Sequence, residues 1–584
     1  MKSFFKNVLA NIVAILLLGG ITTLFFILFL AIGSLTGDSK VRIKNDSVLV
    51  LDGKMKIIDS PSEDQEELFS FGNHGNNVLL YDVLEAIKKA KSDEKIKGIS
   101  IESDFINAGM TQLDDVRNAL EDFKKSGKFV YAYGNLVSQP SYFLGSVADQ
   151  YYLNPSGGID LKGLSSEVIY LKSFAEKFGI GVEVIRHGKF KAAVEPFLRD
   201  DMSPENKEQM ETLLGDIWKI NSAKIAKSRK MDSASLGTTI DSLYGMIPDL
   251  AVQRKLADKL IQKSEYENLI KSKIKADPDK DLNKVSFSKY IRSIDEENKK
   301  SDDHIAVLYA SGAINNGEGY DEIYAENYVK EIKKLSENKK VKAVVLRINS
   351  PGGSANASDE ILFELQELKK KKPLIVSFGD YAASGGYYIA MGADKIYSEP
   401  NTITGSIGVF GLMYYFKDIA NKNGISAHGV STNANSNYYS PINGITEGGK
   451  NIIQKSIEGT YKRFVYFVTQ NRKKTFEQID EVGSGRVWSG TRAKSLGLVD
   501  ELGTLKDAIN YAAKKVGMKE QNVASYPQKR SKFEEFFGNM NEDDIYAKII
   551  KNKVGKENFK IYEMMSNPNQ KNQVMMELPF TIKY

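Results

Sequence analysis

The pattern of apolar and polar residues along this 584-residue chain predicts one long hydrophobic helix, followed by short buried strands and amphipathic helices. Residues 7–37 contain no charged side chain and are mostly apolar. This run exceeds the roughly 20 residues that a helix needs to cross a bilayer. A cleaved signal peptide has an apolar stretch of only about 7–15 residues before a small-x-small site, and no good site ends this run. Residues 1–40 are therefore predicted to form an uncleaved transmembrane signal anchor.

Downstream of the anchor the pattern changes to that of an α/β protein. The run VKAVVLRI (341–348) is typical of a buried strand, and the glycine turn NSPGG follows it. Apolar residues at helical spacing mark ASDEILFELQELKKKK (357–372), and PLIVSFG (373–379) is the next buried strand. Strands and helices that alternate over such short distances predict parallel βαβ units with right-handed connections.

A gap-free internal repeat relates two parts of the chain. Asp149 lies in YFLGSVADQYYLNP, and Asp394 lies in YYIAMGADKIYSEP, 245 positions later. A single offset that holds over about a hundred residues is the signature of duplication. The same offset pairs Lys97 with Lys342, Leu120 with Leu365, Gly134 with Gly379, Tyr142 with Tyr387, Pro155 with Pro400, Gly163 with Gly408, Gly179 with Gly424 and Pro196 with Pro441.

The repeat sets the predicted domain organisation. Two tandem α/β domains are expected at residues 45–292 and 303–525. The polar stretch SIDEENKKSDD (293–303) is typical of a linker between them. Residues 526–584 form a tail without an assigned role, although its final residues, MMELPFTIKY, suit a short closing strand.

The two copies differ at the positions that are suited to chemistry. The second copy has two glycines after a strand and a serine in AASGG at the predicted start of a helix. The first copy has a lysine in HGKFKAAVEPF that the second copy lacks. The differing pairs, with the first copy named first, are Asn107 and Gly352, Ala108 and Gly353, Gln139 and Ser384, and Lys191 and Ser436. Each copy therefore lacks what the other retains.

These residue types match the requirements of amide hydrolysis. Ser384, at a strand-to-helix turn among small residues, would expose its hydroxyl beside helix N-terminal amides. The amide of Gly385 could donate to a tetrahedral oxyanion, as the amide after the nucleophile does in other hydrolases. The turn at Gly352 and Gly353 could supply a second donor, because a residue without Cβ allows a carbonyl to approach the backbone.

A serine nucleophile also needs a base, for which Lys191 is the candidate. A lysine serves as a base only when it is neutral, so its usual pKa of about 10.4 must be lowered by burial. The apolar setting of FKAAV suits that requirement. The four histidines show no placement that suggests a base, although folding could still bring one near Ser384; they are His74, His187, His304 and His428.

The amino-acid composition argues against several other classes of function. The 80 basic and 75 acidic residues leave a net charge of +5 without an isolated basic face or tail, so no nucleic-acid partner is predicted. The absence of cysteine excludes disulfides, Cys-ligated metals and a thiol nucleophile. No cofactor and no metal site are predicted.

Each motif alone has an ordinary structural explanation. AASGG is a common tight start of a helix, SPGG is a common turn, and a lone lysine more often forms a surface ion pair. The three motifs together, complementary across two copies, favour a divided active site.

These motifs resemble those of signal peptide peptidase A (protease IV) in its long, two-repeat form, within the ClpP/crotonase superfamily. The resemblance covers nearly the whole chain from the anchor to about residue 525. The matching segments are GKFKAAVEPFLRDDMSPENK, INSPGGSANASDEI, AASGGYYIAMGADKIYSEPNTITGSIGVFG and GRVWSGTRAKSLGLVDELG.

The resemblance implies a serine endopeptidase with a Ser/Lys dyad, in which Ser384 is the nucleophile and Lys191 the general base. It also implies oxyanion donors at Gly352, Gly353 and Gly385, and it suggests that Ser406 orients the lysine amine. The expected substrates are short apolar peptides such as signal-peptide remnants. A membrane-bound ring or dome of chains, a tetramer in the family, is expected, with the body outside the cytoplasm and the anchor in the inner membrane.

Two other functions compete with this interpretation. A crotonase-type acyl-CoA enzyme would share the fold and the glycine turn, but it would not need Ser384 or Lys191. A catalytically inactive membrane scaffold of the same fold would need neither of them nor the glycines.

Overall fold

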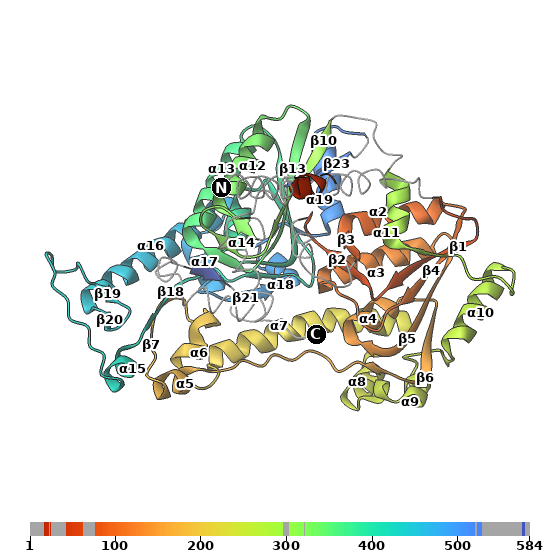
Figure 1. Cartoon of the computed structure of the whole chain (residues 1–584), viewed down its shortest axis with the longest axis horizontal. Helices are drawn as coiled ribbons and strands as arrows, with labels where there is room; N and C mark the ends of the chain where they lie inside the picture. The colour runs from red at the N-terminus through yellow and green to blue at the C-terminus, as the bar shows by residue number, and fades with distance from the viewer. Residues whose placement is uncertain are drawn as a thin grey trace, which may run out of the picture.

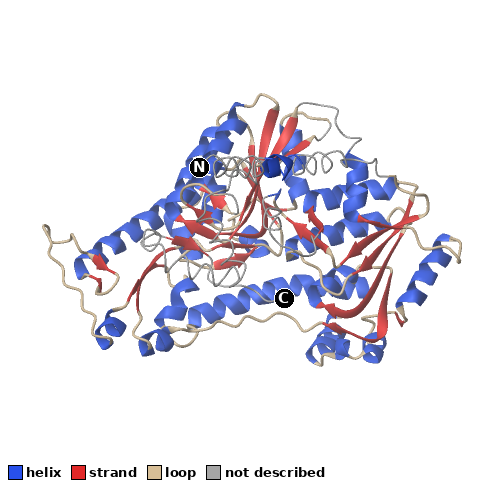
Figure 2. Ribbon diagram, in the orientation of Figure 1, coloured by secondary structure: helices blue, strands red, loops and turns tan. Residues whose placement is uncertain are grey.

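The computed structural model describes residues 17–22, 24, 42–61, 76–295, 303–319, 322–519, 522–527 and 575–577. The predicted anchor lies mostly outside these residues; the two short pieces within it are helical. In the part of the chain that the structure describes, no helix is long and apolar enough to span a membrane. The body contains two α/β repeats that lie next to each other (Figures 1 and 2).

The first repeat is built on a sheet of six parallel strands in the order β8-β6-β5-β4-β1-β9. Their apolar side chains are buried against helices, which is why these strands are nearly continuous hydrophobic runs. The bounds are β1 Ser47–Asp52, β4 Ile96–Glu102, β5 Phe129–Ser138, β6 Gln150–Asp160, β8 Lys259–Leu260 and β9 Lys284–Ser286, with a separate pair β2 Met55–Ile58 and β3 Asn76–Leu79.

The second repeat contains the same strand order in its eight-stranded sheet. The series β22-β16-β15-β13-β10-β23 repeats that of the first sheet, and β17 and β21 extend it beside the end of β15. The bounds are β10 His304–Ser311, β13 Val341–Ser350, β15 Leu374–Ala383, β16 Lys395–Ser398, β17 Ile403–Gly405, β21 Val487–Ser489, β22 Glu501–Leu502 and β23 Val523–Tyr526.

The positions of the helices show the same 245-residue repeat as the sequence. Three helix pairs begin and end 245 positions apart, and so do β5 and β15: α2 Leu80–Ser92 and α12 Ala325–Glu337, α3 Met110–Lys124 and α13 Ala355–Lys369, and α5 Lys172–Lys177 and α15 Lys417–Lys422. The other helices are α4 Gln139–Gly145, α6 Glu195–Leu198, α7 Pro204–Arg229, α8 Ser233–Asp241, α9 Pro248–Gln253, α10 Lys263–Ile274, α11 Phe287–Asp295, α14 Gly385–Ile389, α16 Glu447–Arg472, α17 Phe476–Val482, α18 Gly490–Ser495 and α19 Leu505–Lys515. Short 3-10 turns are η2 Ala192–Val194, η3 Tyr244–Met246 and η4 Ala390–Gly392.

The predicted α/β class and the two repeats are confirmed. Helix α11 runs three residues into the predicted linker and ends at Asp295. Of the predicted tail, the described residues include a final strand, β24, at Met575–Glu577.

A third sheet joins the two repeats in the order β12-β11-β14-β24-β18-β7. Its strands are β7 Gly181–His187, β11 Ile314–Asn315, β12 Ile323–Tyr324, β14 Gly352–Ser354, β18 Val409–Tyr415 and β24, and a small hairpin, β19 Tyr439–Ser440 and β20 Gly444–Ile445, lies nearby. Residues 161–203, here called the first arm, leave β6 and cross to the second repeat as β7, and α7, which begins at Pro204, leads the chain back (Figure 1). There β7 pairs antiparallel with β18 over its full length.

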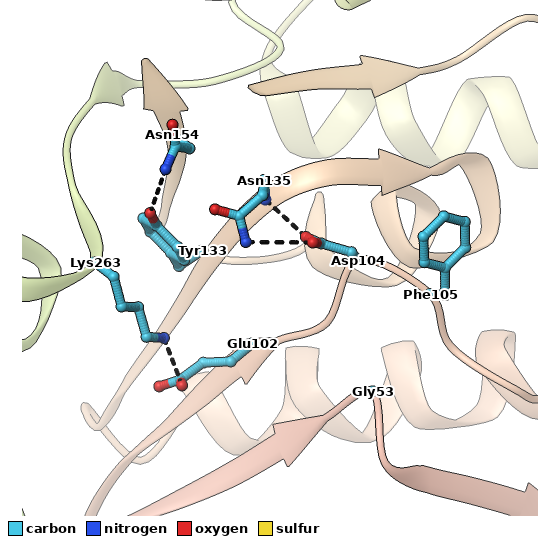
Figure 3. A pocket seen from close by; sticks show the side chains of 8 residues that line it. All are labelled: Gly53, Glu102, Asp104, Phe105, Tyr133, Asn135, Asn154 and Lys263. Carbon is cyan, nitrogen blue, oxygen red and sulfur yellow. Dashed lines mark hydrogen bonds and ion pairs between the residues drawn. The ribbon is translucent and has the colours of Figure 1, made fainter. Parts of the chain in front are cut away.

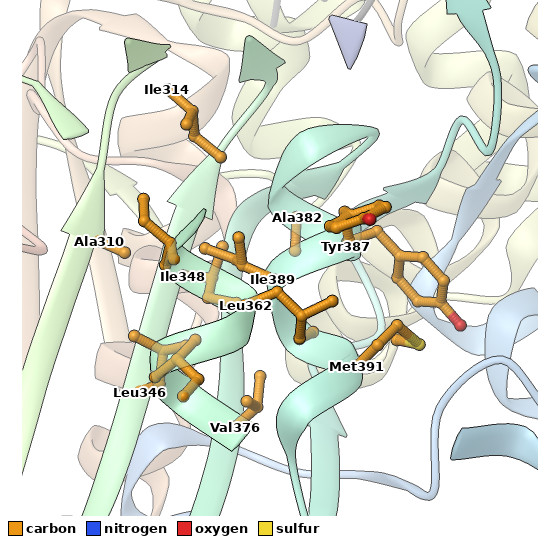
Figure 4. Packing of buried hydrophobic residues seen from close by; sticks show 14 of the residues in the cluster. Ala310, Ile314, Leu346, Ile348, Leu362, Val376, Ala382, Tyr387, Ile389 and Met391 are labelled. Carbon is orange, nitrogen blue, oxygen red and sulfur yellow. The ribbon is translucent and has the colours of Figure 1, made fainter. Parts of the chain in front are cut away.

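The core of the second repeat fixes the strand and helix that will carry Ser384. Leu346 and Ile348 of β13, Val376 of β15 and Ile389 of α14 are each at most 1% exposed. Figure 4 shows these side chains packed between the sheet and the helices above it. Burial on both faces makes this part of the molecule a rigid support for a site.

Candidate active site

Ser384 lies at a strained turn between β15 and α14. Its backbone has φ 56 and ψ −115, a conformation that costs a non-glycine residue roughly 1–3 kcal/mol and persists where the surroundings enforce it. The Ser384 amide donates to the Gly405 carbonyl at 2.9 Å, and its carbonyl accepts from the Tyr388 amide at 2.8 Å. The turn therefore presents the hydroxyl at the first turn of a helix, as predicted.

The first arm delivers Lys191 to this hydroxyl. Lys191 Nζ lies 2.9 Å from Ser384 Oγ, 2.9 Å from Ser406 Oγ and 3.3 Å from the Ser406 carbonyl oxygen. All three residues are fully buried. The structure thus brings together, within one chain, the predicted serine, the predicted lysine and the third residue, Ser406.

Glycines of the second repeat make room for the lysine segment. A Cβ on Gly485 would lie 2.6 Å from the Lys191 amide nitrogen, and one on Gly408 would lie 3.2 Å from its side-chain Cδ. The amide of Phe190 donates to the Ser484 carbonyl at 3.0 Å. The sequence contains Gly485 just before RVWSG, but nothing local to that motif indicates a contact with Lys191.

Polar residues after Lys191 also hold its loop in place. Glu195, 1% exposed, accepts from Asn206 Nδ2 at 3.0 Å and from the Ser203 hydroxyl. Gln209 of α7 donates to the Phe190 carbonyl at 3.1 Å. Sequence reasoning missed these positioning residues, although Glu195, Ser203 and Asn206 all lie in the segment that carries the family resemblance.

The predicted oxyanion glycines converge beside Ser384. Gly352 and Gly353 have φ of 106 and 153, a region that side chains rarely adopt. A Cβ on Gly352 would lie 2.8 Å from the Gly385 amide nitrogen, and one on Gly385 would lie 3.2 Å from the Gly353 amide nitrogen. Two backbone donors therefore lie close to one point at the mouth of the turn.

The histidines that the structure describes have other partners. The His187 ring stacks on Tyr461 at 3.9 Å between centroids, and His304 Nε2 lies 3.0 Å from the Tyr526 hydroxyl. His428 is exposed, and His74 lies outside the described residues. No group of three or more His, Cys, Asp or Glu side chains suited to a metal occurs in the described parts of the chain. The nearest base candidate to Ser384 is thus the lysine.

Comparisons with known proteins agree with this geometry. The sequence model of peptidase family S49 matches residues 122–276 and 366–519, one segment in each repeat, and that of Clp protease matches residues 296–404. The chain is 34% identical over 539 residues to Protease 4 of Haemophilus influenzae, which covers 89% of this chain and 86% of the relative. It is 30% identical over 495 residues to the chloroplastic serine protease SPPA of Arabidopsis thaliana, with 82% and 70% covered.

A shorter relative matches one part of the chain. It bears the name signal peptide peptidase SppA in Enterococcus faecium and is 35% identical over 202 residues, with 34% of this chain and 59% of that protein covered. The family model matches both repeats, and the two long relatives match most of the chain. Together these matches support one family. The chain belongs to peptidase family S49 and is a serine protease with two S49 repeats on an α/β, ClpP-like fold.

Proposed function

We propose that this protease uses a Ser/Lys dyad, in which Ser384 is the nucleophile and Lys191 the general base. The observation that carries the proposal is the 2.9 Å separation of Lys191 Nζ and Ser384 Oγ in a fully buried site. Burial disfavours the charged form of a lysine, which raises the fraction of neutral amine available to accept a proton.

Ser406 orients the amine for that transfer. A neutral amine has two N–H donors and one lone pair. With the two N–H groups directed at the Ser406 hydroxyl and carbonyl oxygens, the lone pair faces the Ser384 hydroxyl. Lys191 can then accept the Ser384 proton as Oγ attacks the peptide carbonyl.

The remaining steps use the same groups. The amide of Gly385 and the amide at Gly353 in the glycine turn stabilise the tetrahedral oxyanion, a contribution of roughly 3–4 kcal/mol per donor in other proteases. The Lys191 ammonium returns its proton to the leaving amine, and a water activated by the neutral lysine releases the acyl group from Ser384.

Two substitutions test the dyad. Ser384→Ala and Lys191→Met, which keeps the length of the side chain without an amine, should each lower kcat for peptide hydrolysis by at least about 10⁴-fold. Both variants should keep the far-UV CD spectrum and melting behaviour of the wild type. A fluorophosphonate probe should label the wild type alone. Near-wild-type turnover by either folded variant would contradict the dyad, and absent labelling of an active wild type would contradict a serine nucleophile.

The proposed substrates are short apolar peptides such as signal-peptide remnants, cleaved by an enzyme anchored in the inner membrane through residues 1–40. One relative is named as a signal peptide peptidase, and an anchored enzyme meets lipid-partitioned peptides at high local concentration. We place the body on the outer side of that membrane. Deletion of residues 1–38 should release an active protein from the membrane fraction, and protease added outside spheroplasts should degrade the full-length body.

We also propose that chains associate head to tail. The first arm buries Ile185 of β7 in the core of the second repeat, where it is 3% exposed. The corresponding segment of the second repeat, residues 406–446, extends to the edge of the molecule and is called the second arm (Figure 1). There Val430, the counterpart of Ile185 at the repeat offset, is fully exposed. The part of the second arm around Val430 therefore lacks the neighbour that Ile185 has in the first arm.

A cavity on the first repeat offers a complementary surface (Figure 3). It measures about 450 Å³ and opens at the ends of β4 and β5, where Asp104 accepts from the backbone and side-chain amides of Asn135 at 2.7 and 3.2 Å. Phe105 at this cavity is 69% exposed. Its other lining residues include Glu102 and Asn154.

In the second repeat the same surface is covered by the first repeat. Asp380, the counterpart of Asn135, accepts from the Thr111 amide at 2.9 Å and so caps the start of α3. Arg347, the counterpart of Glu102, contacts Asp59 at 3.1 Å, and both side chains are 1% exposed. This buried contact holds the two repeats together.

The second repeat also exposes the counterpart of the α3 surface. A cavity of about 310 Å³ lies at the start of α13 and is lined by Asn356 and Asp359, the counterparts of Thr111 and Asp114. The two free surfaces thus correspond to the two halves of one internal contact. Repetition of that contact between chains covers both surfaces and closes a ring, and the family resemblance favours a tetramer.

Light scattering after size exclusion tests this assembly. Val430→Asp should convert the oligomer into folded monomers, because a carboxylate would enter the neighbour's core. Leu243→Asp, at a residue 48% exposed outside both surfaces, is the matched control and should leave the mass unchanged. A wild-type monomer at working concentration, or an intact Val430→Asp oligomer, would contradict the head-to-tail contact.

A further inference from the structure

Helix α7 follows the first arm and packs against the strands of the second repeat that support the serine turn. Leu213 and Ile217 of α7 share a buried cluster with Ile403 of β17 and Val487 of β21, and each of the four is at most 2% exposed. Strand β17 pairs with β15 on one side and with β21 on the other. It ends at Gly405, whose carbonyl accepts from the amide of the nucleophilic serine. The cluster therefore joins α7 to the strand that leads to the site.

Gln209 adds hydrogen bonds to this apolar contact. It lies one helical turn before Leu213 on the same face of α7 and is 1% exposed. Its Nε2 donates to the Phe190 carbonyl and to Asn206 Oδ1, both at 3.1 Å, and its Oε1 accepts from the Val487 amide at 3.3 Å. One side-chain amide thus uses both of its N–H donors and joins the residue before the candidate base to β21.

The bond to Phe190 acts directly on the peptide group that carries the base. The Phe190 carbonyl belongs to the same planar peptide as the Lys191 nitrogen, so the direction of that carbonyl sets the direction in which the lysine leaves the backbone. Without Gln209, the Phe190 carbonyl and the Val487 amide would be buried without a partner, and such groups move toward water. A displacement of about 1 Å in a reacting group can cost about 10²-fold in rate.

The second repeat has the same residue type at the same position but uses it differently. Gln454 of α16 is the counterpart of Gln209 at the offset of 245 residues. It is partly buried and donates to Glu458 of its own helix at 2.9 Å. The second arm has Ser436 in place of Lys191. The glutamine reaches from one repeat to the other only in the copy that carries the lysine.

We propose that Gln209 is a positioning residue for the general base, which fixes the Lys191 peptide against β21 and keeps water away from the amine. This inference rests on the proposed dyad. Gln209 does not touch the substrate or the reacting atoms; it acts through the Phe190 carbonyl.

Charged side chains around the lysine have partners of their own. The Arg186 guanidinium donates to the Lys191 carbonyl at 3.1 Å, Arg486 pairs with Glu208 at 2.8 Å, and Glu195 accepts from the polar side chains described above. Replacement of one neutral side chain by another leaves all of these charges unchanged. A change in the pH dependence of such a variant therefore reports the position and hydration of the amine.

Gln209→Met tests the proposal, because methionine keeps the length of the side chain without its donors and acceptor. In the full-length protein, kcat for an apolar peptide should fall about 10–100-fold, while KM changes less than about threefold. Water admitted to the amine favours its charged form, so the acid limb of the pH–rate profile should move to higher pH. Gln454→Met, the matched control, should leave kcat and the profile unchanged.

Leu213→Ala separates positioning from general loosening of the same contact. It removes apolar packing between α7 and β21 but no hydrogen bond, so it should lower the melting temperature and leave the acid limb in place. Rates are compared per active site, counted by fluorophosphonate labelling carried to completion. If Gln209→Met does not fold, Gln209→Asn, which withdraws the amide by one methylene group, takes its place with the same expectations.

Three results would overturn the role of Gln209 and leave the dyad intact. They are an unchanged kcat in the Gln209 variant, a lower kcat with an unmoved acid limb, and an equal shift of the acid limb in Leu213→Ala. Near-wild-type turnover by Lys191→Met would instead reject the dyad, and this inference with it.

Discussion

The two repeats have the same backbone fold and differ in the residue at one strand-to-helix turn. In the second repeat, Ser384 sits at φ 56 with Lys191 against its hydroxyl. In the first repeat, the counterpart Gln139 uses its side chain to close the turn, accepting from the Gly163 amide at 2.8 Å and donating to the Gly163 carbonyl at 2.9 Å. Where the second copy has the Ser384 hydroxyl, the first copy thus has local hydrogen bonds that stabilise the loop.

The arms complete this division of roles. The first arm forms β7, buries Ile185 and carries Lys191, whereas the second arm exposes Val430 and has Ser436 at the position of the lysine. A contact between chains through the second arm would bring Ser436 to Gln139, a pair without the base that a serine nucleophile needs. Under the proposed assembly, the duplicated surface would make one contact that contains the Ser/Lys pair and one that does not.

Among the variants that compare the two repeats, the largest effect is expected from a side chain added at the glycine turn of the second repeat. Gly352→Ala should lower kcat by about 10³-fold, because the new methyl group would lie in the oxyanion volume and strain a backbone at φ 106. Asn107→Ala, the same position in the first repeat, should leave peptide hydrolysis unchanged, because its exposed side chain lies outside the site. Comparable losses of kcat in both variants would contradict the division of roles between the repeats.

A smaller effect is expected at Ser406, whose counterpart in the first repeat is the buried Leu161. Ser406→Ala removes one of the two Ser406 oxygens that hold Lys191 Nζ, so kcat should fall about 10–100-fold with little change in KM. The charged amine loses more from this change than the neutral amine, so the acid limb of the pH–rate profile should move to lower pH. An unchanged profile with unchanged kcat would exclude Ser406 as a positioning residue.

The sequence predicts the duplication and the candidate site residues better than it predicts the contacts between the two repeats. The offset of 245 residues places α3 with α13 and β5 with β15 without error, because local hydrophobic periodicity specifies these elements. Ser384 and Lys191 stand out because each is present in only one copy. The pairing of β7 with β18 could not be predicted, because strand partners far apart in sequence leave no local pattern.

Other tertiary contacts also leave no recognisable pattern in the sequence. The strand β24 consists of three residues, and its partner Gly353 lies more than 200 positions earlier. Arg347 forms ion pairs with Asp59 of the first repeat and Glu399 of the second, and the sequence around a charged residue on a strand gives no sign that it is buried. Such tertiary contacts override what each segment would do alone.

The smallest expected effect concerns the buried acids between the repeats. Burial raises the pKa of Asp115, and the nearby Asp114 and Asp59 raise it further, while Arg347 lowers it only in part. Asp115 Oδ2 has no hydrogen-bond partner among the described residues. Because the folded state holds this proton more tightly than the unfolded state, the stability contributed by Asp115 is present below about pH 4 and is lost as the pH rises toward its raised pKa.

Asp115→Asn should therefore raise the melting temperature at pH 8, by about 2–4 °C for each kcal/mol gained, and the gain should shrink toward pH 4. The matched control is Asp122→Asn on the exposed face of the same helix, α3, where a hydrogen bond from Lys91 lowers the pKa of the carboxyl group. That variant should give no gain at pH 8, because Asp122 is already ionised and paired in the folded state. Differential scanning calorimetry of both variants across pH 4–8 separates the two cases. A gain for Asp115→Asn that did not vary with pH would show that packing, and not the proton, controls this contact between the repeats.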